Sequence, residues 1–227
     1  MSGFEPVSRG DVLRDSNTAL SADPRTNGLA SLAEYQQEIS KFQLVEAVPY
    51  DVRVHFETAR NLYLYAWFVY RFFPVAEKHA LTTLEFALRL RLAQLFPEQF
   101  GPGAKRPVGM RGLLNRARQE HLISNDGLRA THRWALRRAR HRVEHEATRK
   151  LIETGAEFVE YEAWEVEPES VDFSDDPLGI FIETLPGIRN DYAHGSATLH
   201  ASVLGTFEIV SDLVNSLYGE RSLRPGG

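Results

Sequence analysis

Apolar side chains recur at steps of three and four residues along much of the chain, which is the spacing of one face of an α-helix. The clearest case is residues 75–96, where an apolar stripe is formed by Leu81, Leu84, Leu88, Leu92 and Leu95. Residues 157–167 instead alternate acids with aromatic or aliphatic side chains, which fits either an exposed strand or a fraying helix end. The pattern as a whole predicts an all-α protein.

We expect a bundle of about five to seven helices, with Pro and Gly residues marking many of the helix ends. Apart from residues 75–96, helices are predicted over residues 32–42, 52–73, 113–121, 128–154 and 197–218. A further helix starts at Pro177, and Pro186 either kinks it or begins a new one. The seven aromatics of residues 63–73 indicate packing in a core or dimer interface, with base stacking as the alternative.

The pattern also divides the chain into segments. Residues 1–30 are rich in Ser, Asp, Asn, Gly and Pro without an apolar period, which predicts a flexible or extended N-terminal arm. Residues 31–220 are predicted to form a single helical domain with an acidic elaboration at about 155–176. No run is apolar enough for a membrane helix or a signal peptide, and cysteine is absent. We therefore expect a cytoplasmic protein with no membrane contact, no metal and no cofactor.

Charge is unevenly distributed although the net charge is only −5. Residues 129–150 hold eight Lys or Arg against two acids, whereas residues 153–176 hold ten acids. Two interpretations follow. The basic helix pairs with the acids, within one chain or between subunits, or it contacts RNA phosphates through Arg137, Arg138 and Arg142.

The segment LPGIRNDYAHG at residues 185–195 carries the strongest candidate chemistry. His194 can transfer a proton near neutral pH, and the guanidinium of Arg189 can stabilise the charge of a phosphorane. Asn190 lies four positions before His194 and can orient either group. The five-residue spacing is not specific, because it recurs at Arg116 with His121 and at Arg140 with His145. The context is more informative, since Pro186 precedes the segment and Gly195 is typical of a helix end.

This segment resembles the catalytic motif of the HEPN family, in which an Arg and a polar residue precede a His by a few positions. The resemblance extends over roughly residues 55–218 and includes VAEKHALTTLEFALRLRL and GLLNRARQEHLIS. It implies a HEPN-like helical bundle, a homodimer with a composite site, and metal-independent ribonuclease activity carried by Arg189, His194 and Asn190. HEPN toxins under control of a nucleotidyltransferase often have Tyr two positions after the His, where this chain has Ser196.

RNA transesterification needs one group to accept the 2′-OH proton and another to protonate the leaving 5′-oxygen. The segment supplies one His per chain, so a homodimer would complete the pair. The sequence thus predicts cleavage of single-stranded RNA. The alternative is a non-catalytic HEPN-like module that binds RNA or a protein, such as an antitoxin or regulatory protein in a defence or stress system. In that case Arg189 pairs with an acid and His194 caps its helix.

Two further patterns leave alternatives open. His141, Glu144 and His145 spell the HxxEH pattern of a zinc metalloprotease, although neighbouring arginines disfavour a bound cation. Glu77 and Glu85 lie eight positions apart on the Leu-striped helix. They either orient Arg189 or take part in solvated or structural ion pairs.

Overall fold

The computed structural model describes residues 5–6, 13–26, 31–103, 108–155, 158, 165–194 and 198–219, with the side chains of 5, 6, 193, 194, 198 and 199 left aside. In this part of the chain the α-helices are α1 (Leu32–Ser40), α2 (Tyr50–Tyr65), α3 (Phe72–Leu95), α4 (Pro97–Phe100), α5 (Met110–Gln119), α6 (Arg129–Thr154), α7 (Pro177–His194) and α8 (Leu204–Tyr218). Two-residue strands β1 (Glu5–Pro6) and β2 (Thr198–Leu199) pair antiparallel. The predicted all-α class is confirmed.

The helices form two compact units. The first comprises residues 1–124 and 182–227, and the second comprises residues 125–181. The division predicted from the sequence, an arm over residues 1–30 and one domain over residues 31–220, stays a prediction. Each unit is described by itself below.

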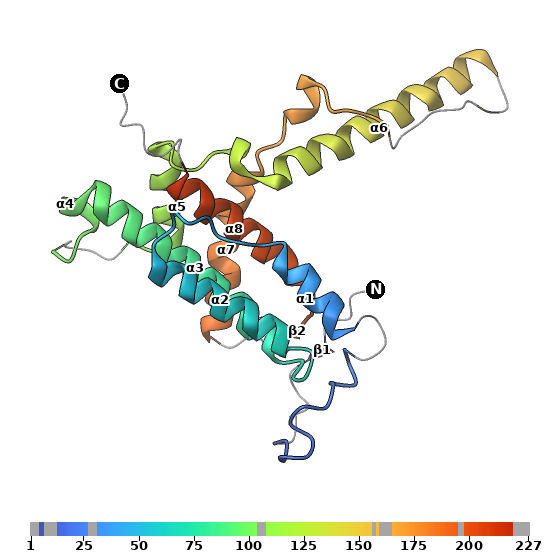
Figure 1. The fold of residues 1–227 in the computed structure, drawn as a ribbon. Helices are drawn as coiled ribbons and strands as arrows, with labels where there is room; N and C mark the ends of the chain where they lie inside the picture. The colour runs from blue at the N-terminus through green and yellow to red at the C-terminus, as the bar shows by residue number, and fades with distance from the viewer. Residues whose placement is uncertain are drawn as a thin grey trace. The chain divides into compact units, whose positions relative to one another are not determined.

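The core of the first unit lies where α3 packs against α2 and α8 (Figure 1). The leucine stripe of α3 faces this core, since Leu81, Leu84, Leu88 and Leu92 are fully buried, whereas Leu95 is exposed. Large aromatic side chains fill the space between the helices, namely Phe56, Phe73 and Phe207. Burial of these side chains supplies most of the free energy that holds the three helices together. Of the seven aromatics at residues 63–73, Tyr63, Tyr70 and Phe73 are buried, as the packing interpretation predicts, whereas Tyr65 is exposed.

One predicted helix boundary is wrong. The helix expected over residues 52–73 ends at Tyr65, and α3 begins before Pro74, which occupies the first turn of α3. Proline is tolerated there because first-turn N–H groups have no acceptor within the helix. The break is stabilised by Asp23, whose carboxylate accepts from the backbone N–H of Tyr70 and whose own N–H donates to Trp67 O at 2.9 Å.

Two further boundaries concern α7 and α8. α7 continues through Pro186 as one helix, so Pro186 does not begin a new one. The last helix starts at Leu204 and not near residue 197, because Thr198–Leu199 pairs with β1 and His200 is held by side-chain contacts described below. Residues 198–200 thus make their contacts elsewhere in the unit and not within α8.

The second unit is built around α6. α6 begins one residue after the predicted start and ends at Thr154, as predicted. Gly155 follows it with a left-handed φ of 64°, which is typical of a helix end. Its buried residues are all small, namely Ala130, Ala135, Ala139 and Ala147. The short 3₁₀ helix Ser170–Phe173 packs against it. Of the stretch 157–167, most residues lie outside the described part, so its predicted strand or helix end stays undecided.

Candidate functional site

Arg189 and Asn190 lie in the C-terminal half of α7, on the part that belongs to the first unit. Ile182 and Leu185 point into the core and are buried, which turns the next residues toward the edge of the unit. Arg189 is half-buried and Asn190 is exposed. The Nη1 of Arg189 donates to Asn190 Oδ1 at 3.3 Å. Asn190 thus contacts the guanidinium, one of the two groups that it was predicted to orient.

Glu85 of α3 binds Arg189 through the other terminal nitrogen of the guanidinium. Glu85 Oε2 lies 3.0 Å from Arg189 Nη2, and the two side chains are 12% and 36% exposed. The same carboxylate binds Arg89 Nη2 at 2.7 Å, and that nitrogen also donates to Val108 O at 2.8 Å. Glu85 thus forms an ion pair with Arg189, which fits both interpretations, orientation of Arg189 and a structural ion pair. Two guanidinium groups share one carboxylate, which leaves a local excess of positive charge.

A cavity of about 540 Å³ opens beside this ion pair. It is lined by Glu85, Gly109, Met110, Arg111, Gly112, Pro186, Gly187, Arg189 and Asn190. The N-terminus of α5 forms one wall, and its first turn has neither a side-chain cap nor an acid. Arg111 contributes a further guanidinium, paired with Glu183 at 2.8 Å. Backbone N–H groups at a helix N-terminus and guanidinium groups both favour an anion, so the cavity has the chemistry of a phosphate site.

His194 is the last residue of α7, and its side chain lies outside the described residues, as does Gly195. The expected pairing of Asn190 with His194, and the position of His194 relative to the cavity, therefore stay predictions. What the structure brings together from the predicted set is Arg189 and Asn190.

A second cluster was not found by reading the sequence. Glu77 of α3 is only 3% exposed, and its carboxylate accepts hydrogen bonds from the hydroxyls of Tyr192 and Thr206. His200 Nε2 lies 2.9 Å from Tyr192 Oη and 3.5 Å from Glu77 Oε2. Burial of Tyr192, followed by its hydrogen bond to Glu77 and the charge of that carboxylate, raises the pKa of the phenol well above its usual range. Tyr192 therefore stays protonated and ties the motif of α7 to α3.

One sequence signal pointed to this cluster. Glu77 lies four positions before Leu81, so it falls on the apolar stripe of α3, where an acid is buried and needs partners. Its partners are 115 and 129 positions away, and no local pattern specifies them.

In the second unit the arginines of α6 pair with acids. Arg138 binds Asp175 through Nε and Nη2 at 2.8 and 2.7 Å, and Arg142 binds Asp172 through Nη2 at 2.9 Å. The hydrogen bond from each arginine lowers the pKa of its aspartate. Intramolecular pairing is therefore observed for Arg138 and Arg142, whereas Arg137 is exposed.

The HxxEH pattern does not gather further ligands in the part of α6 that is described. His141 Nδ1 lies 3.6 Å from Glu144 Oε2, and both side chains are exposed. Among the described residues, no group of three His, Cys, Asp or Glu side chains is placed to hold a metal ion.

The geometry of the site is thus the main guide to function. No protein-family model, curated protein or solved structure matches this chain. Within the described ranges, every helix is too short or too polar to cross a membrane. A function is therefore inferred from the cavity beside Arg189 and from the motif at residues 189–194.

Proposed function

We propose that this chain is a metal-independent endoribonuclease that cleaves single-stranded RNA by 2′-OH transesterification. The observation that supports this most is the cavity in which Arg189 and Asn190 meet the uncapped N-terminus of α5. A phosphodiester there would meet guanidinium groups and backbone N–H donors without a metal ion. The resemblance of residues 189–194 to the HEPN motif suggests the reaction class.

In this mechanism Arg189 binds the non-bridging phosphate oxygens, and Glu85 and Asn190 hold its guanidinium in place. The 2′-oxygen attacks phosphorus while its proton passes to His194. The bond from phosphorus to the 5′-oxygen breaks, and the leaving oxygen takes a proton from the same histidine of a second copy. The products are a 2′,3′-cyclic phosphate and a 5′-hydroxyl. Each proton transfer would contribute about 10² to 10⁴ in rate.

The mechanism requires a homodimer, because the segment offers one His per chain. We place the enzyme in the cytoplasm, in a defence or stress system of toxin–antitoxin type, where a regulatory protein or antitoxin would restrain it. Any such partner would act most directly by covering the cavity beside Arg189.

The test is cleavage of a labelled single-stranded RNA in EDTA. Wild type should release fragments ending in a 2′,3′-cyclic phosphate, and His194→Ala should be slower by about 10² or more. Arg189→Ala should lose a similar factor because the phosphorane charge is no longer stabilised. His141→Ala is the matched control, an exposed histidine of α6 that should leave the rate unchanged.

Two outcomes would overturn the mechanism. Cleavage that survives His194→Ala would show that another residue transfers the proton. Cleavage that needs a divalent ion would exclude the metal-free mechanism. Sedimentation checks the dimer requirement separately, since a monomeric wild type that still cleaves RNA would contradict the two-histidine step.

One observation favours a second candidate, a non-catalytic module that binds RNA or a protein. Arg189 is already paired with Glu85, which is what a structural role for this arginine predicts. In that case EDTA assays show no cleavage by wild type. Fluorescence anisotropy of labelled RNA then distinguishes the two partner classes, since RNA binding that weakens with salt and with Arg189→Ala favours the RNA-binding module.

A further inference from the structure

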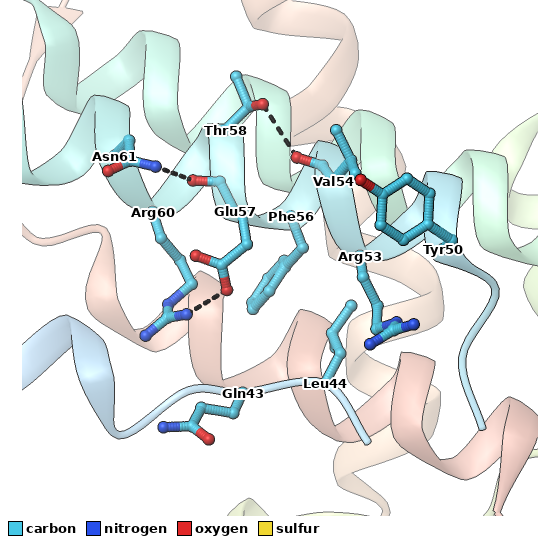
Figure 2. Close-up of a pocket in the computed structure, with 10 residues that line it drawn as sticks. All are labelled: Gln43, Leu44, Tyr50, Arg53, Val54, Phe56, Glu57, Thr58, Arg60 and Asn61. Carbon is cyan, nitrogen blue, oxygen red and sulfur yellow. Dashed lines mark hydrogen bonds and ion pairs between the residues drawn. The ribbon is translucent and has the colours of Figure 1, made fainter. Parts of the chain in front are cut away.

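A separate cavity of about 660 Å³ lies in the first unit, between α2 and the segment that precedes it. Ten residues line it: Gln43, Leu44, Tyr50, Arg53, Val54, Phe56, Glu57, Thr58, Arg60 and Asn61 (Figure 2). None of them belongs to the cavity beside Arg189. The volume is in the range of sites that hold small organic ligands.

The wall opposite α2 is held in place by α8. The side-chain amide of Asn215 donates to Gln43 O at 2.9 Å and accepts from the N–H of Val45, also at 2.9 Å. Arg60 Nε donates to Ile39 O at 3.4 Å, which ties α2 to the residues just before the wall. Both sides of the cavity are thus fastened by hydrogen bonds, and a ligand would not have to order them.

The charges in the cavity do not cancel. Arg60 forms an ion pair with Glu57, so these two residues contribute no net charge. Arg53 has no ion pair and no side-chain hydrogen bond to any described residue, and its buried Nε lacks a partner. The guanidinium contacts the ring of Tyr50, with 5.9 Å from Cζ to the ring centroid. Because no described acid neutralises this partly exposed guanidinium, it is the group in the cavity that an anion would meet.

Apolar side chains line one part of the cavity beside this charge, and the polar Gln43, Thr58 and Asn61 line another part. Figure 2 shows Arg53 and Arg60 on either side of Phe56, with Leu44 beside the guanidinium of Arg53. Phe56 is fully buried and forms the floor, whereas the ring of Tyr50 is exposed at the edge. The cavity thus combines one uncompensated positive charge with aromatic and aliphatic surface.

We propose that this cavity binds a small organic carboxylate with an aromatic or aliphatic body. The planar carboxylate matches the fork of the Arg53 guanidinium, and the body packs against Leu44, Phe56 and Tyr50. A monoanion is favoured over a phosphate dianion because Arg53 supplies the one uncompensated positive charge, while Arg60 is neutralised by Glu57. The site is independent of the proposed ribonuclease reaction.

The test is calorimetric titration of the full chain with 4-phenylbutyrate, its neutral amide and phenyl phosphate. The acid should bind, and the amide should bind about tenfold more weakly because it lacks the charge that Arg53 meets. Arg53→Gln should weaken binding of the acid by a similar factor. Arg149→Gln is the matched control, an exposed arginine of α6 that should leave binding unchanged.

A gain-of-binding variant complements these losses. Glu57→Gln should strengthen binding of phenyl phosphate by about tenfold relative to wild type, since it removes the ion-pair partner of Arg60 and leaves a second uncompensated guanidinium in the cavity. Circular dichroism checks that each variant is folded, and Arg53→Lys, which retains the charge, should keep more affinity than Arg53→Gln. The proposal is overturned if 4-phenylbutyrate does not bind saturably below about 10 mM, or if it binds Arg53→Gln as well as wild type.

Discussion

Glu77 and Glu85 lie eight positions apart on α3 and have different roles. Glu85 lies near the surface and binds Arg89 and Arg189, whereas Glu77 is buried and accepts hydroxyl hydrogen bonds. The apolar stripe explains the burial of Glu77, because that residue occupies a stripe position. Arg89 is a local partner of Glu85, four positions along α3, but Arg189, Tyr192 and Thr206 come from α7 and α8, and no local pattern assigns them to one acid or the other.

Glu77 should be important for stability. Replacing it by Gln keeps the size of the side chain but turns an acceptor oxygen into an N–H donor that faces other donors. We expect Glu77→Gln to lower the free energy of unfolding by about 1–3 kcal/mol, measured by urea denaturation. Glu98→Gln, on exposed α4, is the control and should change it by less than about 0.5 kcal/mol. Equal stabilities for the two variants would show that the buried network contributes little.

Asp23 should make stability depend on pH in the acid range. Its burial opposes the charge most strongly, but hydrogen bonds from Arg25 and the N–H of Tyr70 outweigh that effect and lower the pKa to about 2. A carboxyl whose pKa is lower in the folded state stabilises the fold above its unfolded pKa, and the stabilisation is lost as pH falls through the folded value. Wild type should therefore lose this contribution between about pH 4 and pH 2.

The measurement compares urea unfolding of wild type and Asp23→Asn. Their difference should be larger near neutral pH than at about pH 2 by about 1 kcal/mol, allowing for solvent screening of the arginines. A difference that is constant with pH would mean that the charge of Asp23 does not stabilise the fold.

At the scale of elements, the sequence predicted α1, α3, α5 and α6 well because each has a periodic apolar face or clear end signals. The break between α2 and α3 was missed because its cause is distant. Asp23 and Thr26 satisfy backbone groups of residues 67 and 70, which lie more than forty positions away. Aromatic residues on all sides looked like one buried helix, and only tertiary hydrogen bonds make the break favourable.

The start of α8 was missed for a related reason. Residues 198–203 have an apolar period compatible with a helix, but β1 pairs with residues 198 and 199, and Glu77 and Tyr192 hold His200. Long-range contacts therefore outweigh local helix propensity at this end.

At the scale of the whole molecule, the sequence indicated Arg189 and Asn190, and these residues line one cavity. The sequence did not indicate that the N-terminus of α5 forms another wall of this cavity, because α5 lies about eighty positions before Arg189 and only the tertiary fold brings them together. The proposed mechanism also requires a histidine from a second copy, and the sequence of one chain does not specify where a second copy binds.

The two units should differ in local stability. α3 and α6 are both long helices, but α3 buries large side chains such as Leu84 and Leu88, whereas α6 buries only alanines. Native-state hydrogen exchange followed by mass spectrometry should show faster exchange over residues 129–154 than over residues 72–95, by about tenfold or more. Equal protection of the two helices would contradict this difference, and the exposed ends of each helix serve as the internal reference for fast exchange.

The hydrogen bonds of Asn215 with Gln43 and Val45 affect when the cavity beside Arg53 can form during translation. Val45 and Asn215 are 170 positions apart, and the ribosome makes the chain from its N-terminus. During translation α2 emerges early, but the segment before it cannot be fastened until α8 has left the ribosome. The cavity between them is therefore completed late, after nearly all other helices have been made, and a nascent chain would display Arg53 and Arg60 on an open helix face until then.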